Sequence, residues 1–207
     1  MAADTSTANA LKLEDATADD IPALVEIWFA AFHNDPALAH LWPNTGGVRK
    51  WWEDANRNDM LNKLTFHRYI KIVDTESTDL QRKPRIAAWA KWDLSMPEER
   101  GRRYPPWHED MPAGECDVFF GREETERRRV MGSLKHFYLD TLVTHPGYQR
   151  RGAGLMLLQW GCNLADEHGV GAYVDASKAG ARLYERCGFV DESGSDAGDV
   201  ASMARRP

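Results

Sequence analysis

The sequence predicts a domain of mixed α and β structure built around one sheet, and three observations support this. Helix-like and strand-like segments alternate along the chain. Residues 68–74 and 86–95 both alternate apolar and polar side chains across a polar turn, which predicts a β-hairpin. The apolar segment "HFYLDTLVTHP" (136–146) predicts a buried central strand that ends at Pro146. Because a hairpin is antiparallel, we expect a mixed sheet rather than a wholly parallel one.

Length and composition indicate one large soluble domain. The chain has 207 residues, of which 43% are hydrophobic and 28% are charged. Its net charge of −6 gives no general attraction to nucleic acid or to anionic membranes, so we expect neither as a partner.

The cysteines and the N-terminus favour a cytoplasmic protein. Cys116, Cys162 and Cys187 show no CxxC pair and no metal-ligand spacing, so we expect reduced thiols and no metal. The segment "MAADTSTANA" lacks the apolar region of a signal peptide, and we expect residues 1–10 to form a flexible tail before a single domain of residues 11–207.

The first elements follow from local signals. Leu11 and Leu13 alternate as in a short strand, and Asp19 or Asp20 with Pro22 predicts the start of a helix. We expect a loop over residues 33–47 and a helix over 48–66.

Residues 96–136 form a long insertion between expected strands. Its first part is rich in proline and charge, and a helix is expected from about residue 119. Glu123→Arg127 and Glu124→Arg128 have favourable i,i+4 spacing, and the acidic pair and "ERRR" (126–129) indicate a solvated helix face. A long insertion of this kind is usually disordered or part of a binding site, and the aromatic residues Tyr104, Trp107 and Phe119 favour contact with a substrate.

The segment "HPGYQRRGAGLMLLQW" (145–160) places Gly152 and Gly154 at the start of an apolar helix. Glycine costs a helix interior about 1 kcal/mol relative to alanine, so another reason must favour it here. Exposed amides at a helix N-terminus bind phosphates, and glycine permits close approach. A Walker A loop would need a following lysine, and a dinucleotide fingerprint would need a third glycine at Leu157. An ordinary surface turn before a core helix remains the alternative.

Shorter elements complete the chain. Residues 172–176 are expected to form a strand, 178–187 a short helix, and 200–203 a last strand.

Taken together, "LVTHPGYQRRGAGLMLL" resembles the acyl-CoA signature of the GNAT superfamily of N-acetyltransferases, Q/R-x-x-G-x-G/A. "LKLEDATADDIPALVEIWFAAF" is similar to the superfamily's first strand and helix, and "ASKAGARLYERCGF" to a late segment of it. The residues "AS" before the late helix and Gly180 within it resemble those of a group of uncharacterised fungal members. The resemblance implies a GNAT-like α+β fold with a mostly antiparallel mixed sheet, splayed between strands 4 (137–143) and 5 (172–176) and flanked by helices.

The resemblance also implies a cosubstrate, acetyl-CoA, and its site. Tyr184 matches the tyrosine that protonates the departing thiolate, and a phenol remains protonated at neutral pH. Ser177 and Gly180 stand where many members have asparagine and alanine, and Ser177 also suits the N-cap of the 178–187 helix. The residues expected to contact CoA are Leu142, Val143, Gln149, Arg150, Arg151, Gly152, Ala153, Gly154 and Ser177.

Direct attack by an amine needs a general base. Asp140 is the first candidate, because it is a charge in an apolar strand and lies two residues from Leu142, hence on the same face. Tyr138, on that face, is a weaker candidate, and Glu26 and Asp35 are further ones. Asp140 could instead be a structural carboxylate.

The expected function is transfer of acetyl from acetyl-CoA to an amine, most simply that of a small molecule, with the insertion of residues 96–136 as the acceptor-site region. A protein or peptide N-acetyltransferase and a non-catalytic CoA-binding module are the alternatives. No pattern in the sequence sets the oligomeric state, and a homodimer stays open.

Overall fold

The computed structural model describes residues 10–63, 65–80, 82–195 and 198–207. Residues 1–9 of the expected tail therefore lie outside the described part. Ala10 is 2% exposed, and its carbonyl accepts a hydrogen bond from Thr75 N at 2.8 Å. Residue 10 thus belongs to the folded domain.

The described chain begins with a short strand, three α-helices and a β-hairpin, and helices and strands alternate as expected after the hairpin. The strands are β1 (Leu11–Asp15), β2 (His67–Thr78), β3 (Pro84–Asp93), β4 (His136–Thr144), β5 (Gly171–Ser177), β6 (Val190–Asp191) and β7 (Val200–Arg205). The helices are α1 (Ile21–Phe32), α2 (Pro36–Leu41), α3 (Gly46–Asn62), α4 (Ala113–Met131), α5 (Ala153–His168) and α6 (Ala181–Glu185).

Within the described residues, seven strands form one sheet in the order β1-β2-β3-β4-β5-β7-β6. β4 and β5 pair in parallel and all other neighbours pair antiparallel, which confirms the mixed, mostly antiparallel sheet. The β2–β3 hairpin is also confirmed.

The sheet divides between β4 and β5. These strands pair only from His136↔Gly171 to Tyr138↔Tyr173, whereas β4 continues to Thr144 and β5 to Ser177. Beyond Tyr138, β4 stays paired with β3, and beyond Tyr173, β5 stays paired with β7. The expected splay is therefore confirmed, and we call the opening between the two strands the fork.

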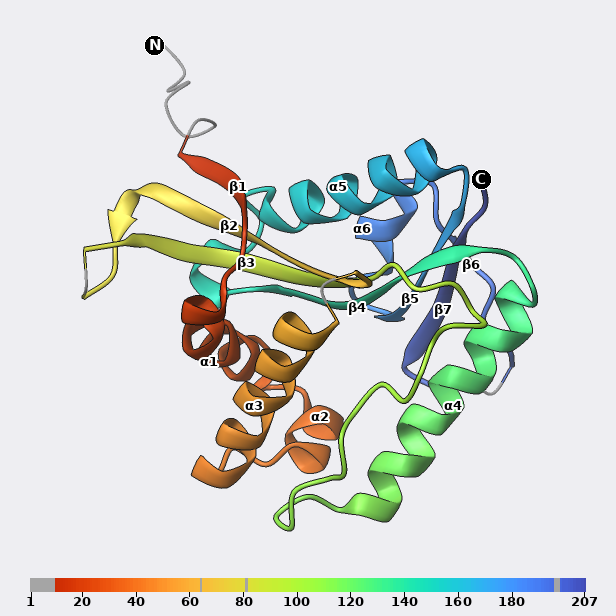
Figure 1. The fold of residues 1–207 in the computed structure, drawn as a ribbon, viewed down its shortest axis with the longest axis horizontal. Coiled ribbons are helices and arrows are strands. Elements are labelled where there is room, and N and C mark those ends of the chain that lie inside the picture. The colour runs from red at the N-terminus through yellow and green to blue at the C-terminus, as the bar shows by residue number, and fades with distance from the viewer. Residues whose placement is uncertain (1–9, 64, 81, 196–197) are drawn as a thin grey trace.

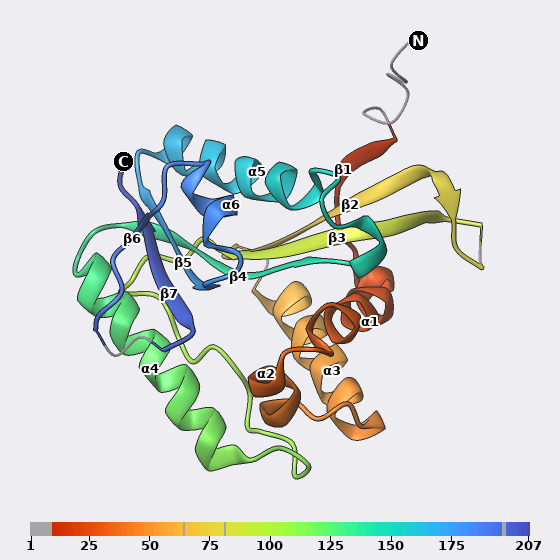
Figure 2. The same cartoon turned by 180° about the vertical axis from the view of Figure 1, so that it is seen from behind.

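Helices cover both faces of the sheet (Figures 1 and 2). α5 and α6 lie on one face, where Leu157, Leu158 and Tyr184 pack with Trp92 and Leu139 from the strands. α1 to α4 lie on the other face. There α1, α3 and the segment before α4 share a second, aromatic-rich core, and the C-terminal half of α4 packs beside β5 and β7. No described helix has both the length and the apolarity that a bilayer crossing requires.

A β-bulge interrupts β4 at the fork. Lys91 pairs with Thr141 but Trp92 pairs with Leu139, so Asp140 is an extra residue. Because of this bulge, Leu142 packs with the core on the α5 face, while Asp140 contacts Lys91, which reaches Asp59 of α3 on the opposite face. The prediction that Asp140 and Leu142 share a face was therefore wrong, since strict alternation fails across a bulge.

Four helices differ from the sequence predictions, one of them α6, which spans Ala181–Glu185 and not 178–187. α2 lies in the expected loop of residues 33–47, where the Asp35 carboxylate accepts hydrogen bonds from Ala37 N and Leu38 N at 3.0 Å each. α3 begins at Gly46 and ends at Asn62, earlier than predicted at both ends. α4 begins at Ala113, six residues before the predicted start, because its first turn buries Cys116 against Leu41 O.

Candidate functional site

The turn before α5 has a left-handed backbone conformation that favours glycine at residue 152. Arg150 and Gly152 have φ angles of +65° and +91°, and Gly152 is the N-cap of α5. A Cβ at Gly152 would meet nothing within 4 Å, so the positive φ and not protein packing favours glycine there. Met156 N is the first amide of the helix to bond back, to Gly152 O at 3.1 Å, which leaves the earlier amides directed outward.

The two arginines of this turn are arranged differently. The Arg151 guanidinium lies 3.7 Å from the Asp74 carboxylate and 4.9 Å from the centre of the Tyr148 ring. Arg150 and Gln149 are exposed. Arg151 thus contacts β2 as well as the turn, but its side chain is still 39% exposed, so both arginines are accessible from solvent.

The remaining expected cofactor residues lie on β4, α5 and β5. Leu142 and Val143 follow the bulge, where β4 has no β5 partner on its open side. A Cβ at Gly154 would lie 3.4 to 3.5 Å from Leu183, Leu142 and Thr144, which places α5, α6 and β4 together. Ala153 is 1% exposed and packs in the core.

Ser177 ends β5 and faces the turn that precedes α6. Its Oγ accepts a hydrogen bond from Gly180 N at 3.2 Å, whereas α6 begins only at Ala181 with Gly180 as N-cap. Ser177 therefore caps the turn before α6 and not the helix itself. The prediction of Ser177 as N-cap was wrong, because the N-cap is Gly180, three residues later.

Tyr184 lies in α6 on the α5 face of the sheet. It is 7% exposed and its ring packs edge-on against Phe189. Burial raises the pKa of its phenol, so the group stays protonated at neutral pH. None of the described residues forms a hydrogen bond with its hydroxyl, which is free to donate to a ligand.

Asp140 is held in a buried ion-pair network. Its carboxylate lies 3.4 Å from both Lys91 Nζ and Arg103 Nε, and Lys91 Nζ donates to Asp59 Oδ2 at 2.6 Å. Burial raises the pKa of Asp140, but the charges of Arg103 and Lys91 outweigh burial and hold the pKa below its ordinary range. A carboxylate so stabilised is a weak base. This geometry favours a structural role for Asp140.

The other proposed bases also have structural partners. Glu26 forms an ion pair with Arg49 on the surface of the α1–α3 layer, and Asp35 caps α2. The Tyr138 hydroxyl donates to Asp175 Oδ2 at 3.0 Å, so it is a hydrogen-bond donor to another carboxylate.

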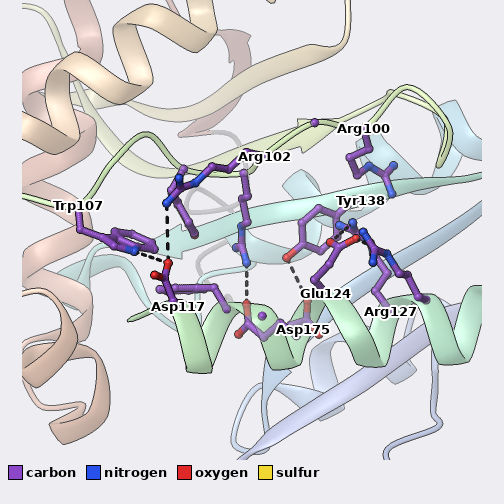
Figure 3. Close-up of a pocket in the computed structure, with 15 residues that line it drawn as sticks. Arg100, Arg102, Trp107, Asp117, Glu124, Arg127, Tyr138 and Asp175 are labelled. Atoms are coloured by element: carbon purple, nitrogen blue, oxygen red, sulfur yellow. Dashed lines mark hydrogen bonds and ion pairs between the residues drawn. The ribbon is translucent and has the colours of Figure 1, made fainter. Parts of the chain in front are cut away.

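A cavity of about 420 Å³ opens beside the fork on the α4 face. Figure 3 shows Tyr138 and Asp175 pointing toward one another from β4 and β5, with α4 and the segment of residues 100–107 around them. The cavity is lined by Arg100, Gly101, Arg102, Arg103, Tyr104, Trp107, Asp117, Phe120, Gly121, Glu123, Glu124, Arg127, Arg128, Tyr138 and Asp175.

Two carboxylates of this cavity were missed by sequence reasoning. Glu123 accepts a hydrogen bond from Arg103 Nη1 at 2.6 Å and does not pair with Arg127, so the predicted Glu123→Arg127 pair was wrong, whereas Glu124 pairs with Arg128 at 2.9 Å. Burial raises the pKa values of Glu123 and Asp175. Asp175 interrupts the apolar strand "GAYVDAS" just as Asp140 interrupts its own, and that shared signal could have found it.

A family model described as "Acetyltransferase (GNAT) family" matches residues 71–189 of the chain. The chain belongs to the GNAT family. The match begins in β2 and ends after α6, so it includes the fork, the Gly152 turn and Tyr184.

One curated relative is an acetyltransferase of the fungus Stachybotrys chartarum, 32% identical over 90 residues. That alignment covers 43% of this chain and 38% of the relative, so the chain spans well under two thirds of the relative's length.

Solved structures share the GNAT fold. Arylalkylamine N-acetyltransferase 2 from Aedes aegypti superposes with a TM-score of 0.66 at 12% identity, covering 96% of this chain and 99% of that one. A histone acetyltransferase-related protein from Corynebacterium glutamicum gives 0.59 at 20% identity, covering 96% and 97%. PaiA N-acetyltransferase from Thermoplasma acidophilum, solved with coenzyme A, gives 0.58 at 11% identity, covering 95% and 99%. At these identities the likeness establishes the fold alone.

Proposed function

We propose that this GNAT protein transfers the acetyl group of acetyl-CoA directly to an amine, most simply that of a small molecule. The observation that carries the proposal is the continuity of three features. The open fork lies along β4, the Gly152 turn begins α5, and Tyr184 belongs to α6. These elements are neighbours, because Gly154 of α5 lies against Leu142 of β4 and Leu183 of α6.

The Gly152 turn fits a pyrophosphate. The outward amides of the first turn of α5, the partial positive charge of that helix end and the open space at Gly152 all favour an anion. In this proposal Gln149, Arg150, Gly152, Ala153 and Gly154 hold the pyrophosphate, while Arg151 acts through its contacts with Asp74 and Tyr148.

The pantetheine arm of CoA would enter the fork. Backbone groups of Leu142 and Val143 on the open side of β4 are free of a β5 partner, so they can hydrogen-bond the amides of the arm. Ser177 would face the arm from the other strand. The structurally similar Thermoplasma protein was solved with coenzyme A, which supports a coenzyme A site in this fold.

Tyr184 would protonate the departing thiolate. Its buried, protonated phenol lies three residues after Ala181, in the helix that contacts Gly154 through Leu183. Asp140 would not accept the amine proton in this scheme. It would neutralise Lys91 and Arg103 and so fix the bulge at the fork.

The experiment has two parts. Calorimetric titration with acetyl-CoA measures cosubstrate binding, and thiol release in the presence of small amines or lysine-containing peptides measures transfer and acceptor class. Turnover with small amines supports the proposal, and turnover with peptides alone would favour the protein N-acetyltransferase alternative. Tight binding without transfer to any acceptor would favour a CoA-binding module.

A further inference from the structure

We propose that Asp175 is the general base of the transfer, and that the cavity under α4 receives the acceptor, a small monoamine. This inference rests on the proposed acetyltransferase function and assigns the acceptor side of the same site.

The position of Asp175 on β5 supports the assignment. Tyr173 is the last β5 residue that pairs with β4, and Asp175 follows two residues later, about 7 Å further along the strand. Val174 packs in the core on the α5 face, whereas Tyr173 packs with residues of α4. Asp175, alternating with Val174, therefore lines the α4 side of the fork.

Tyr184 lies on the opposite face of the sheet. It belongs to the core that α5 and α6 form with the strands. A thioester in the fork would thus have a proton donor on one face and a carboxylate on the other. The amine would approach the thioester carbon from the α4 face, and the thiolate would receive its proton on the α6 face.

Neutral donors hold the Asp175 carboxylate. It accepts hydrogen bonds from Tyr138 at 3.0 Å and from Tyr173 at 2.8 Å. Among the described residues, no lysine, arginine or histidine nitrogen lies within ion-pair distance of it. A partly buried carboxylate without a paired cation favours a cationic ligand, and the ammonium group of an acceptor fits that need.

Asp175 differs in this respect from Asp140. Two cations contact Asp140 directly, whereas the charged groups facing Asp175 are Arg103 from the segment before α4 and Arg127 and Glu123 from α4 itself. Burial raises the pKa of Asp175 despite the opposing charge of Arg103, so its carboxylate is a stronger base than an ordinary aspartate.

The cavity lining indicates the acceptor class. Tyr104, Trp107 and Phe120 supply apolar surface, and the volume of about 420 Å³ suits a small molecule. Five arginines line the same cavity: Arg100, Arg102, Arg103, Arg127 and Arg128. Four carboxylates also line the cavity, and three of them form ion pairs with these arginines: Asp117, Glu123 and Glu124. Among the described residues, Asp175 is the one carboxylate of the lining without an ion pair, so the cavity offers a partner to one ammonium group. A monoamine with an apolar or aromatic body therefore fits better than a polyamine.

The chemical step balances as follows. The acceptor ammonium gives one proton to the Asp175 carboxylate, and the free amine attacks the thioester carbon. The new C–N bond forms, the C–S bond breaks, and Tyr184 protonates the thiolate of CoA. The second proton lost from the nitrogen replaces the one that Tyr184 gave, so the products are the acetamide, CoA thiol and one proton released from Asp175.

The test compares wild type, Asp175→Asn, Asp175→Glu and Tyr138→Phe. Each is assayed for acetyl-CoA affinity by calorimetry and for kcat across pH with an amine that the wild type acetylates. Asp54→Asn, which removes an exposed carboxylate of α3, is the matched control.

We expect Asp175→Asn to lower kcat by about 10²- to 10⁴-fold, to abolish the acidic limb of the pH profile and to leave acetyl-CoA affinity unchanged. Asp175→Glu should restore part of the rate. Tyr138→Phe removes a hydrogen bond to the carboxylate and should move the acidic limb to higher pH. Asp54→Asn should match wild type.

Each alternative result has a distinct meaning. Wild-type kcat and an unchanged acidic limb in Asp175→Asn would overturn the base assignment but leave the acetyltransferase function standing. If Asp175→Asn no longer binds acetyl-CoA, the test rests on the pH profile of kcat for Tyr138→Phe. An acidic limb at the wild-type position in that profile overturns the base assignment. If the wild type binds acetyl-CoA but acetylates no amine, the proposed function and this inference fall together. Faster acetylation of polyamines than of monoamines would overturn the acceptor class.

Discussion

The Tyr138 hydroxyl of β4 donates a hydrogen bond to the Asp175 carboxylate of β5, 3.0 Å away, just where these two strands separate. This bond joins the two sides of the fork on the α4 face. It also fixes the direction of a carboxylate that lines the adjacent cavity. The opening and its acidic group are therefore parts of one arrangement.

Gly152→Asp should abolish measurable CoA binding, because the new carboxylate would lie against the pyrophosphate at the N-terminus of α5. Gly169→Asp is the matched control at the other end of the same helix. Gly169 also has a positive φ, +61°, and open space around it. Both variants should lose about 1–2 kcal/mol of stability from backbone strain. Calorimetry should show lost CoA affinity in the first alone, and equal affinities would refute the pyrophosphate site.

Tyr184→Phe should lower kcat by about 100-fold or more and leave CoA affinity and stability nearly unchanged, since no described residue bonds its hydroxyl. Tyr69→Phe provides the contrast. The Tyr69 hydroxyl donates to buried Asn56 at 3.0 Å, so this variant should lose about 1 kcal/mol of stability while kcat stays the same. Thiol-release kinetics and denaturant unfolding measure the two effects, and full activity of Tyr184→Phe would remove its acid role.

Lys91→Met should destabilise the protein by about 3–5 kcal/mol, because it leaves the buried carboxylates of Asp59 and Asp140 without their shared cation. Lys50→Met removes the exposed Lys50–Asp54 pair of α3 and should change stability by no more than about 0.5 kcal/mol. Urea unfolding of both variants checks this. Similar small losses in both would show that the network contributes little.

Stability should fall as the pH drops from about 6.5 toward 4, and His136 supplies one reason. Burial lowers its pKa from 6.5 to about 4, so the unfolded chain binds a proton in this range that the folded protein does not. At about 1.4 kcal/mol per pH unit, the loss is at most about 3.5 kcal/mol.

His136→Gln should flatten this part of the stability profile. Its Nδ1 lies 2.7 Å from Leu134 O and its Nε2 lies 3.0 Å from Arg100 Nη1, contacts that an amide can also make. Urea unfolding at several pH values measures the slope. An equally steep loss in His136→Gln would assign the effect to other groups.

Much of the fold follows from the sequence because its signals are local. The hairpin of β2 and β3, the start of α1 near Asp20 and the glycine turn before α5 all depend on residues within a few positions. α2 was missed although Asp35 and Pro36 form a good helix start, because its six residues are too short to show a period.

The acceptor side of the site could not be predicted in the same way. Glu123 looks like a surface residue by its spacing, and only the fold shows that Arg103 draws it inward. The bulge at Asp140 likewise depends on pairing with β3, so the sequence alone assigned its face wrongly. Charges buried by tertiary contacts leave no periodic signal.

The most direct test of the account is a single-turnover reaction of the wild-type protein with a stoichiometric amount of acetyl-CoA and a panel of small monoamines, analysed by mass spectrometry. We expect one acetylated amine for each CoA thiol released and no acetyl group on the protein. Bound acetyl-CoA that acetylates none of the amines, or a covalent acetyl-protein intermediate, would contradict direct transfer at the fork.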